Sequence, residues 1–279
     1  MKTVLFDEIV KKVKVTCLKA GCQMNKDAYD CLSKAYMEET LPAAKFALDI
    51  MLKNANIARE SNSPLCQDTG MAVVFVKVGQ EVNIEGGFIS DAINEGVRQA
   101  YSEGYFRKSV LDPITRQNTL DNTPAVIHYE IVKGEKLKIS VLLKGFGSEN
   151  MSKLFMLTPS DGIDGIKQAV IRSVKEAGGN PCPPIIVGVG IGGTMEKAAI
   201  MSKHCLLREI SSKNEDGFLD AMEEELKESI NKLNIGAQGF GGKNTVFKVF
   251  IEKYPTHLAG LPVAVTLQCH ASRHGEIVF

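Results

Sequence analysis

The feature that most constrains the fold of this chain is a change of pattern at Ser61. Residues 1–60 are predicted to be helical, because apolar residues recur there at helical spacing in three successive runs. From Ser61 onward, short apolar segments rich in β-branched residues, the first at 71–78, alternate with loops rich in Gly, Pro and Asn. The chain is therefore predicted to combine a helical start with a body of strands and helices.

The body beyond Ser61 is predicted to hold a mixed β-sheet with flanking helices. One stretch has a strand–helix–strand pattern and another predicts a hairpin around Lys133-Gly134-Glu135, a combination typical of a mixed sheet. The predicted fold class is α+β (mixed α/β), with a single domain over 1–279 in which a helical subdomain, 1–60, packs on a body, 61–279. The predicted strands are 71–78, 125–132, 136–143, 184–189, 245–252 and 262–268, and the predicted helices of the body are 88–103, 161–177, 194–204 and 216–234.

The charge balance excludes several classes of partner. The 279 residues include 33 Lys and Arg against 33 Asp and Glu, so the chain has no net charge with which to hold nucleic acid or an anionic membrane. No apolar run approaches the roughly 20 residues that span a bilayer, and the first residues lack the continuous apolar stretch of a signal peptide. We expect a cytoplasmic protein that holds any anionic ligand through local groups.

Three of the seven cysteines stand in loops beside predicted strands. Cys66 precedes Gln67-Asp68-Thr69-Gly70, Cys182 lies between two prolines, and Cys269 ends a strand. Strand ends are where a rigid scaffold presents ligands, yet a free cysteine is more often a small buried hydrophobe, so both interpretations stay open. The other cysteines, which lie in helical patterns and are expected to be core or inert surface residues, are Cys17, Cys22, Cys31 and Cys205.

Two Gly-rich turns could bind an anion. Residues 188–193 match the GxGxxG pattern of dinucleotide-binding loops, but the surroundings lack a convincing second parallel strand, and a tight turn whose following helix faces an anion fits equally. Residues 144–150 place backbone N–H groups near Ser148 and Asn150, which suits a carboxylate or phosphate, although a plain surface turn would have the same composition.

The remaining polar residues divide into candidates and structural groups. His257 lies in a loop before an apolar strand and could act as an acid, a base or a ligand. Arg273 follows Cys269 closely and could bind a carboxylate with two parallel hydrogen bonds. His128 and His204 are predicted to be structural. The acidic run 223–225 is predicted to be a solvated helix face.

Several segments, taken together and in order, carry a resemblance to a known family. They are Cys66-Gln67-Asp68-Thr69-Gly70, the turn from Gly145 to Met151, Asn180-Pro181-Cys182-Pro183-Pro184 with the glycines up to Gly193, and Gln238-Gly239-Phe240-Gly241-Gly242. Over essentially its whole length the chain resembles the alpha subunit of the class I, iron–sulfur-dependent fumarate hydratases and the related L-tartrate dehydratases. Phe146 departs from the family pattern, which continues a run of glycines after Lys144.

The resemblance implies a 4Fe–4S cluster that is held through three of its irons by Cys66, Cys182 and Cys269. The fourth iron would stay open to a hydroxyl and a carboxylate oxygen of the substrate, and as a Lewis acid it would make hydroxide a better leaving group. Delocalisation of charge into a bound carboxylate would stabilise the carbanion-like transition state. The reaction requires no redox change.

The resemblance also implies which residues surround the substrate and which partner completes the site. Asp68 and His257 would take part in catalysis. In this family a proton-transferring Thr and further cationic ligands come from the other half of the enzyme, which no segment here matches, so a beta subunit and an α2β2 assembly are implied by analogy. The residues expected to bind substrate are Gln67, Arg107, Gly147, Ser148, Asn150 and Arg273.

The resemblance favours fumarate as the substrate, because Ser148-Glu149-Asn150-Met151 is similar to the fumarase form of this loop. The predicted reaction is the reversible hydration of fumarate to malate, and the alternative is dehydration of L(+)-tartrate. Two other classes remain open: an NAD-dependent oxidoreductase that uses the turn at 188–193, and an iron–sulfur protein without hydratase activity.

Overall fold

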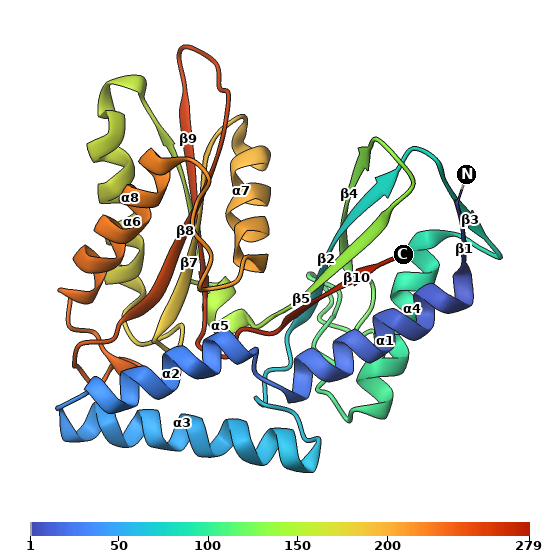
Figure 1. Ribbon diagram of the computed structural model, residues 1–279, viewed down its shortest axis with the longest axis horizontal. Helices are drawn as coiled ribbons and strands as arrows, with labels where there is room; N and C mark the ends of the chain where they lie inside the picture. Colours follow the sequence, from blue (N-terminus) through green and yellow to red (C-terminus); the bar gives the residue numbers. More distant parts are fainter. Residues whose placement is uncertain (1) are drawn as a thin grey trace. The chain divides into compact units, whose positions relative to one another are not determined.

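The computed structural model describes residues 2–279, and they form two compact units, each with its own β-sheet (Figure 1). Five alternating stretches of chain build the units, so the chain passes from one to the other four times. The three helices within residues 1–60 are shared between both units, and the single-domain organisation expected for the chain stays a prediction. The first unit comprises 2–25, 54–146 and 273–279, and the second comprises 26–53 and 147–272.

The first unit is built on a mixed four-stranded sheet and a separate two-stranded parallel pair. The strands are β1 (Lys2–Leu5), β2 (Met71–Gly79), β3 (Val82–Glu85), β4 (Val126–Val132), β5 (Leu137–Lys144) and β10 (His274–Val278). The main sheet has the order β10-β5-β2-β4, with β2 parallel to β4 and antiparallel to β5, and β5 antiparallel to β10. In the small pair, β1 lies alongside β3. The nine-residue run of β2, rich in Val, suits a strand at the middle of a sheet.

Two helices of the first unit, α1 (Phe6–Cys22) and α4 (Ile89–Glu103), cover one face of its main sheet (Figure 1). Alternate residues of β2, namely Ala72, Val74 and Val76, are buried in one apolar core with residues of both helices. Apolar residues at every second position of β2 and at helical spacing along α1 therefore face the same apolar layer. This layer packs against β2 and β5, whose ends hold the candidate residues described below.

The second unit contains a four-stranded sheet that is also mixed. Its strands are β6 (Lys153–Leu157), β7 (Ile185–Gly192), β8 (Val246–Tyr254) and β9 (Leu261–Gln268). The order is β6-β9-β7-β8, in which β7 and β8 are parallel and β9 is antiparallel to both of its neighbours. The strands β7 and β9 are buried almost throughout, as expected of strands covered on both faces.

Helices cover both faces of the second sheet (Figure 1). The apolar sides of α6 (Gly162–Ala177) and α8 (Gly217–Asn231) form one core with β7, β8 and β9. The other face is covered by α7 (Met195–His204), which packs on β7 and β9. The remaining helices are α2 (Lys26–Glu38), α3 (Pro42–Ser61), the short α5 (Phe146–Glu149) and three 3-10 turns at Pro159–Asp161, Cys205–Leu207 and Ala237–Gly239.

The glycines of β7 have a packing role. A Cβ on Gly188 would lie 2.0 Å from the carbonyl oxygen of Ser202, and one on Gly190 would lie 2.1 Å from that of Ala198. Both oxygens belong to α7, so the backbone of this helix rests directly on the strand. Close helix–strand packing thus accounts for two glycines of the GxGxxG pattern without any nucleotide.

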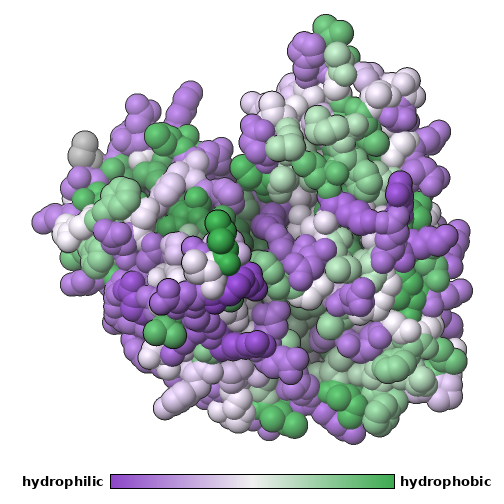
Figure 2. All heavy atoms as spheres, turned by 180° about the vertical axis from the view of Figure 1, so that it is seen from behind, coloured by the Kyte–Doolittle hydropathy of each residue, from purple (hydrophilic) through white to green (hydrophobic). Residues whose placement is uncertain are grey.

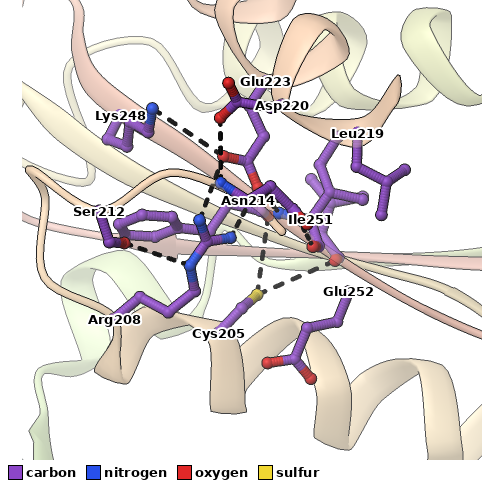
Figure 3. Close-up of polar contacts among 12 residues, drawn as sticks. Cys205, Arg208, Ser212, Asn214, Leu219, Asp220, Glu223, Lys248, Ile251 and Glu252 are labelled. Carbon is purple, nitrogen blue, oxygen red and sulfur yellow. Dashed lines mark hydrogen bonds and ion pairs between the residues drawn. The ribbon is translucent and has the colours of Figure 1, made fainter. Parts of the chain in front are cut away.

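A buried network of charged groups ties α8 to β8 (Figure 3). The carboxylate of Glu223 is fully buried and accepts hydrogen bonds from Arg208 Nη1 at 2.7 Å, Asn214 Nδ2 at 2.8 Å and the Ile251 N–H at 2.9 Å. The prediction of a solvated face for the run 223–225 is therefore wrong at its first residue. The carboxylate tolerates burial because three donors replace its water shell.

The mixed α+β class is confirmed, but the predicted hairpin around Lys133-Gly134-Glu135 is wrong. The strands on either side of this turn, β4 and β5, both pair with β2 and not with each other. The end of β2 lies between them, where Gly79 N–H donates to the carbonyl of Lys136. The first residues, predicted to be helical, form β1, and strands β3, β6 and β10 were not predicted because they are short and lie at sheet edges or in the small pair.

No helix within residues 2–279 is long and apolar enough to cross a membrane. Figure 2 shows hydrophilic side chains over much of the face it draws, with hydrophobic side chains in smaller groups between them. This surface agrees with a chain whose apolar residues are gathered mainly in a core within each unit. The cytoplasmic location expected for the chain stays a prediction.

Candidate functional site

In the first unit, the loop after Cys66 is held by the carboxylate of Asp68. Its Oδ2 accepts a hydrogen bond from the Phe146 N–H at 2.7 Å, and its Oδ1 accepts one from the Gly70 N–H at 3.0 Å. The bond from Phe146 joins the loop at the start of β2 to the turn at the end of β5, and the bond from Gly70 holds the loop itself. The sequence pattern singled out both segments, and the structure shows that Asp68 connects them.

Arg273 lies against the same loop. Its side chain is 1 % exposed, and its Nη1 donates a hydrogen bond to the backbone carbonyl of Asp68 at 2.6 Å. Its Nε is buried and has no hydrogen-bond partner within residues 2–279. A buried guanidinium normally satisfies all of its donors, so this unpaired N–H is an exception that calls for an explanation.

Gly145 leaves room for these two side chains. A Cβ at this position would lie 3.0 Å from Nη2 of Arg273 and 3.1 Å from Oδ2 of Asp68. The absence of a side chain therefore lets the turn approach both charged groups. Lys144, the residue before it, is also almost fully buried, and its Nζ donates to the carbonyl oxygen of Gly145 at 3.3 Å.

A second layer of hydrogen bonds supports the Asp68 loop. The Tyr101 hydroxyl, buried within the unit, donates to the Gly70 carbonyl at 2.8 Å, and the Asn122 Nδ2 donates to the same oxygen at 3.2 Å. Burial raises the pKa of Tyr101, so its hydroxyl keeps the proton that it donates. Thr69 Oγ1 donates to the Arg107 carbonyl at 3.0 Å, which fixes the backbone of Arg107 beside the loop while its side chain is exposed.

In the second unit, Cys182 and Cys269 lie at the same end of two paired strands. Cys182 precedes β7 and Cys269 follows β9, and the antiparallel register pairs Ile186 with Gln268. Nδ1 of His270 lies 3.0 Å from the carbonyl oxygen of Cys182, so it is the protonated nitrogen of that ring. Cys182 is exposed and adopts a positive φ of 56°, whereas Cys269 is half-buried.

The turn that contains Gly147, Ser148 and Asn150 belongs to the second unit and lies beside the Cys182 loop. Nδ2 of Asn180 donates to the sulfur of Met151 at 3.7 Å, and a Cβ on Gly147 would lie 3.6 Å from the carbonyl oxygen of Asn180. Ser148 is buried and Asn150 is exposed. In the same turn Glu149 forms an ion pair with Lys203 of α7.

The third predicted ligand, Cys66, belongs to the first unit together with Gln67. Its sulfur is half-buried, and the preceding residue is anchored by a bond from the Leu65 N–H to the carbonyl of Gly21 at 2.9 Å. Gln67 is exposed. Across the described part of the chain, no group of three or more His, Cys, Asp or Glu side chains is arranged to hold a metal ion.

His257 lies apart from the two cysteines of its own unit. It is exposed in the loop between β8 and β9, at the opposite end of the second sheet from Cys182 and Cys269. Eight residues of strand span roughly 26 Å, which separates this histidine from both cysteines. Its Nδ1 accepts a hydrogen bond from the Ala259 N–H at 3.2 Å.

Three of the other four cysteines are core residues, as the sequence predicts, and Cys31 is half-buried. Cys17, Cys22 and Cys205 are buried, and burial raises the pKa of Cys17 to about 12 and that of Cys205 well above its ordinary value. The thiol of Cys205 donates to backbone carbonyls, including that of Phe250 at 3.6 Å (Figure 3). A buried thiol that resists ionisation is a poor ligand for iron.

Some residues of the site carry no signal in the sequence. Tyr101 and Asn122 stand 32 and 53 residues beyond Thr69, and only the folded sheet brings them to the Asp68 loop. Gln268 is fully buried beside Cys269. Its position next to a candidate ligand was visible in the sequence, but its burial was not.

Known proteins match this chain over nearly its whole length. Residues 10–278 match the family model described as fumarate hydratase (Fumerase). A Methanocaldococcus jannaschii protein provisionally named L(+)-tartrate dehydratase subunit alpha is 42% identical over 261 residues, which cover 91% of this chain and 92% of that protein. The L(+)-tartrate dehydratase subunits alpha of Escherichia coli and Shigella sonnei are each 32% identical over 260 residues, 92% of this chain and 86% of theirs.

Proposed function

Because the chain belongs to the fumarate hydratase (Fumerase) family, we propose that it is the alpha subunit of a hydro-lyase acting on a small dicarboxylic acid. The observation that supports this proposal best is the buried guanidinium of Arg273, which is bound to the Asp68 loop and has an unpaired Nε. A carboxylate accepts two parallel N–H bonds from a guanidinium. An anionic substrate would remove the cost of a buried donor without a partner.

L(+)-tartrate is the first substrate to consider. Relatives that are named for its dehydration align over more than nine tenths of this chain. Fumarate, which the sequence alone favoured, is the second candidate and is supported by the description of the family model and by the loop Ser148-Glu149-Asn150. Both are four-carbon diacids that need two carboxylate contacts, so the same arginine would serve either.

The donor set fits an iron–sulfur cluster. Of the seven cysteines, those proposed as ligands lie in loops with their sulfurs exposed or half-buried, and two of them share one end of a strand pair. The thiols shown to resist ionisation lie elsewhere. We propose that Cys66, Cys182 and Cys269 hold a 4Fe–4S cluster, which when bound would supply a Lewis-acidic iron for the hydroxyl that leaves or enters.

The protein's own residues would bind and orient the diacid. Arg273 would hold one carboxylate and draw negative charge toward it as a proton leaves the neighbouring carbon. The two backbone N–H groups that bind Asp68 fix its carboxylate, and each oxygen keeps a lone pair with which to hold a proton. Arg107, whose backbone is tied to Thr69, would bind the second carboxylate through its exposed guanidinium.

A second subunit would complete the enzyme. The relatives are named as alpha subunits, and a chain that supplies one part of a catalytic site requires a partner for the remainder. We propose a beta subunit that contributes the missing proton-transfer group, within an α2β2 assembly. His257, which lies far from the cysteines of its own unit, stays a candidate only.

Anaerobic co-expression with a candidate beta subunit tests the proposal. The purified complex should be brown, contain close to four irons per alpha chain and turn over L(+)-tartrate or fumarate when assayed on both and on malate. Changing Cys66, Cys182 or Cys269 individually to Ser should remove iron and activity.

Cys31→Ser is the matched control, because this half-buried thiol lies within helix α2 and not in a loop. It should keep iron and turnover. A complex that contains no iron, or that loses iron in the Cys31 variant but not in the Cys182 variant, would contradict the ligand assignment. A complex with iron but no activity on any of the three acids would leave an iron–sulfur protein that is not a hydro-lyase.

A further inference from the structure

The side chain of Gln268 is buried against the sulfur of a proposed cluster ligand. It is the last residue of β9, and it is 0 % exposed. Its Nε2 lies 3.7 Å from Sγ of Cys269 and 3.5 Å from the carbonyl oxygen of Ala271. Its Oε1 has no hydrogen-bond partner within the described residues. A buried amide oxygen without a partner costs free energy, so the place of this side chain beside the sulfur calls for an explanation.

The contacts of Cys269 change when its sulfur binds a metal. In the free thiol, Sγ donates to the carbonyl oxygen of Ala271 at 3.8 Å. A metal-bound cysteine is a thiolate, which has no proton and can only accept hydrogen bonds. Gln268 Nε2 is already placed to donate to that sulfur, so the amide is arranged for the ligated state.

The strands hold the amide in a fixed position. Gln268 is paired with Ile186 across β9 and β7. This is the last residue pair of the two strands before the loops that contain Cys182 and Cys269. On the far side of Cys269, His270 is bound to the carbonyl oxygen of Cys182. Gln268 and His270 therefore flank the ligand, one against its sulfur and one against the neighbouring ligand loop.

We propose that Gln268 is a positioning residue whose amide donates to the Cys269 thiolate and thereby sets the reduction potential and the iron retention of the bound cluster. The inference rests on the proposed function, because it requires Cys269 to ligate a cluster. Hydrogen bonds to ligand sulfurs withdraw charge from the thiolate, which makes a cluster easier to reduce. They also orient the ligand, so their loss lowers the affinity for the metal.

The experiment compares Gln268→Met and Gln268→Leu in the anaerobically purified alpha–beta complex. Met has a similar length and Leu is a smaller apolar side chain, and neither has an N–H group to donate. Each complex is assayed for iron per chain, for the midpoint potential of the cluster by a titration followed by electron paramagnetic resonance, and for the rate of iron loss in air. We expect a more negative potential in both variants and iron loss several-fold faster than in the wild type.

Thr266→Val is the matched control. Thr266 lies two residues earlier on β9, is buried, and has its hydroxyl 2.7 Å from that of Ser202 instead of a cysteine. This variant should lose some thermal stability while keeping the wild-type reduction potential. It therefore measures how far the loss of a buried hydrogen bond in β9 affects the protein without a change beside Cys269.

Two results would overturn the inference, and they differ in what else they overturn. If the wild type holds iron and both Gln268 variants keep its potential and its rate of iron loss, the inference is wrong and the proposed function stands. If the wild-type complex takes up no iron at all, the cluster assignment fails and the inference fails with it.

Discussion

The two units present their candidate residues in unlike surroundings. In the first unit, Asp68 and Arg273 are tied into a dense set of hydrogen bonds, and charged groups are buried close together. In the second unit, Cys182 is exposed and Cys269 half-buried, and the thiols donate long hydrogen bonds, that of Cys182 to the Asn180 carbonyl at 4.0 Å and that of Cys269 to the Ala271 carbonyl at 3.8 Å. Under the proposed function, the first unit would bind the anion and supply one cluster ligand, Cys66, and the second unit would supply the other two ligands.

The largest effect that would separate the two contributions is expected from Asp68→Asn. The change removes the charge but keeps the size and alters none of the three proposed ligands, Cys66 in the same loop included, so the cluster should be retained. Turnover should fall by about 100-fold, the scale of a lost acid–base group, while iron per chain stays at the wild-type level. Steady-state kinetics and iron analysis of the same sample measure both.

Asp49→Asn on α3 is the control for this change, because Asp49 forms only an i,i+4 ion pair with Lys53. It should leave turnover within twofold of the wild type. If Asp68→Asn proves fully active, Asp68 does not belong to the site. If Asp68→Asn instead loses iron, Asp68 is needed to retain the cluster and its role is not limited to the substrate.

A large effect on stability alone is expected from Gly188→Ala in the second unit. The new methyl group would lie 2.0 Å from the carbonyl oxygen of Ser202, so α7 must move away from β7. Overpacking of this kind costs about 3 kcal/mol of the free energy of unfolding. Chemical denaturation measures it, with Gly217→Ala, where a Cβ meets nothing within 4 Å, as the unaffected control. Equal stability of the two variants would show that the GxGxxG glycines are not needed for packing.

A smaller effect on substrate binding is expected from Gly145→Ala. Its Cβ would stand 3.0 Å from Arg273 Nη2 and 3.1 Å from Asp68 Oδ2, so these side chains must shift by a few tenths of an ångström. We expect KM to rise by about tenfold with little change in the melting temperature, since lost contacts to the diacid are the main consequence. Gly260→Ala, which has open space around its Cβ, should behave as the wild type. An unchanged KM for Gly145→Ala would contradict the crowded arrangement.

The smallest effect concerns the acid stability of the first unit. Burial opposes ionisation of Asp121, but hydrogen bonds from Arg98 and Thr123 outweigh it and lower the pKa of this carboxyl to about 2. The unfolded chain takes up the proton first, near pH 4, so the stabilisation by Asp121 is complete above that pH and is lost as the pH falls toward 2. Asp121→Asn should make unfolding less dependent on pH between 4 and 2, as followed by circular dichroism. Parallel curves for the two proteins would contradict this assignment.

Local pattern predicted most elements of this fold but not how they pair. The run 71–78 was correctly predicted as a strand, because its β-branched residues are typical of one. The turn at 133–135 was predicted to close a hairpin, yet β2 lies between the two strands that it joins. Strand pairing depends on contacts between segments that are distant in the sequence. Because β2 forms hydrogen bonds with both β4 and β5, the pattern of adjacent segments alone could not predict this strand order.

The same limit applies to the site. Motifs identified the Asp68 loop and the turn at 144–150, because Gly, Asp and Asn favour turns at strand ends, where a scaffold presents its ligands. They did not reveal that Arg273 would be buried with an unpaired Nε, or that Asn122 would support the loop, since both depend on the completed sheet. His257 carried an equally good local signal, and the structure places it at the other end of its own sheet.

The passage of the chain between the units has a consequence for biosynthesis. The sheet of the first unit lacks its fourth strand until residues 274–278 have left the ribosome, long after β2, β4 and β5 have emerged. Until then the outer edge of β5 is an unpaired row of backbone donors and acceptors, the kind of surface on which nascent chains associate wrongly. A chaperone that covers an exposed strand edge would therefore have its longest task on this half of the molecule.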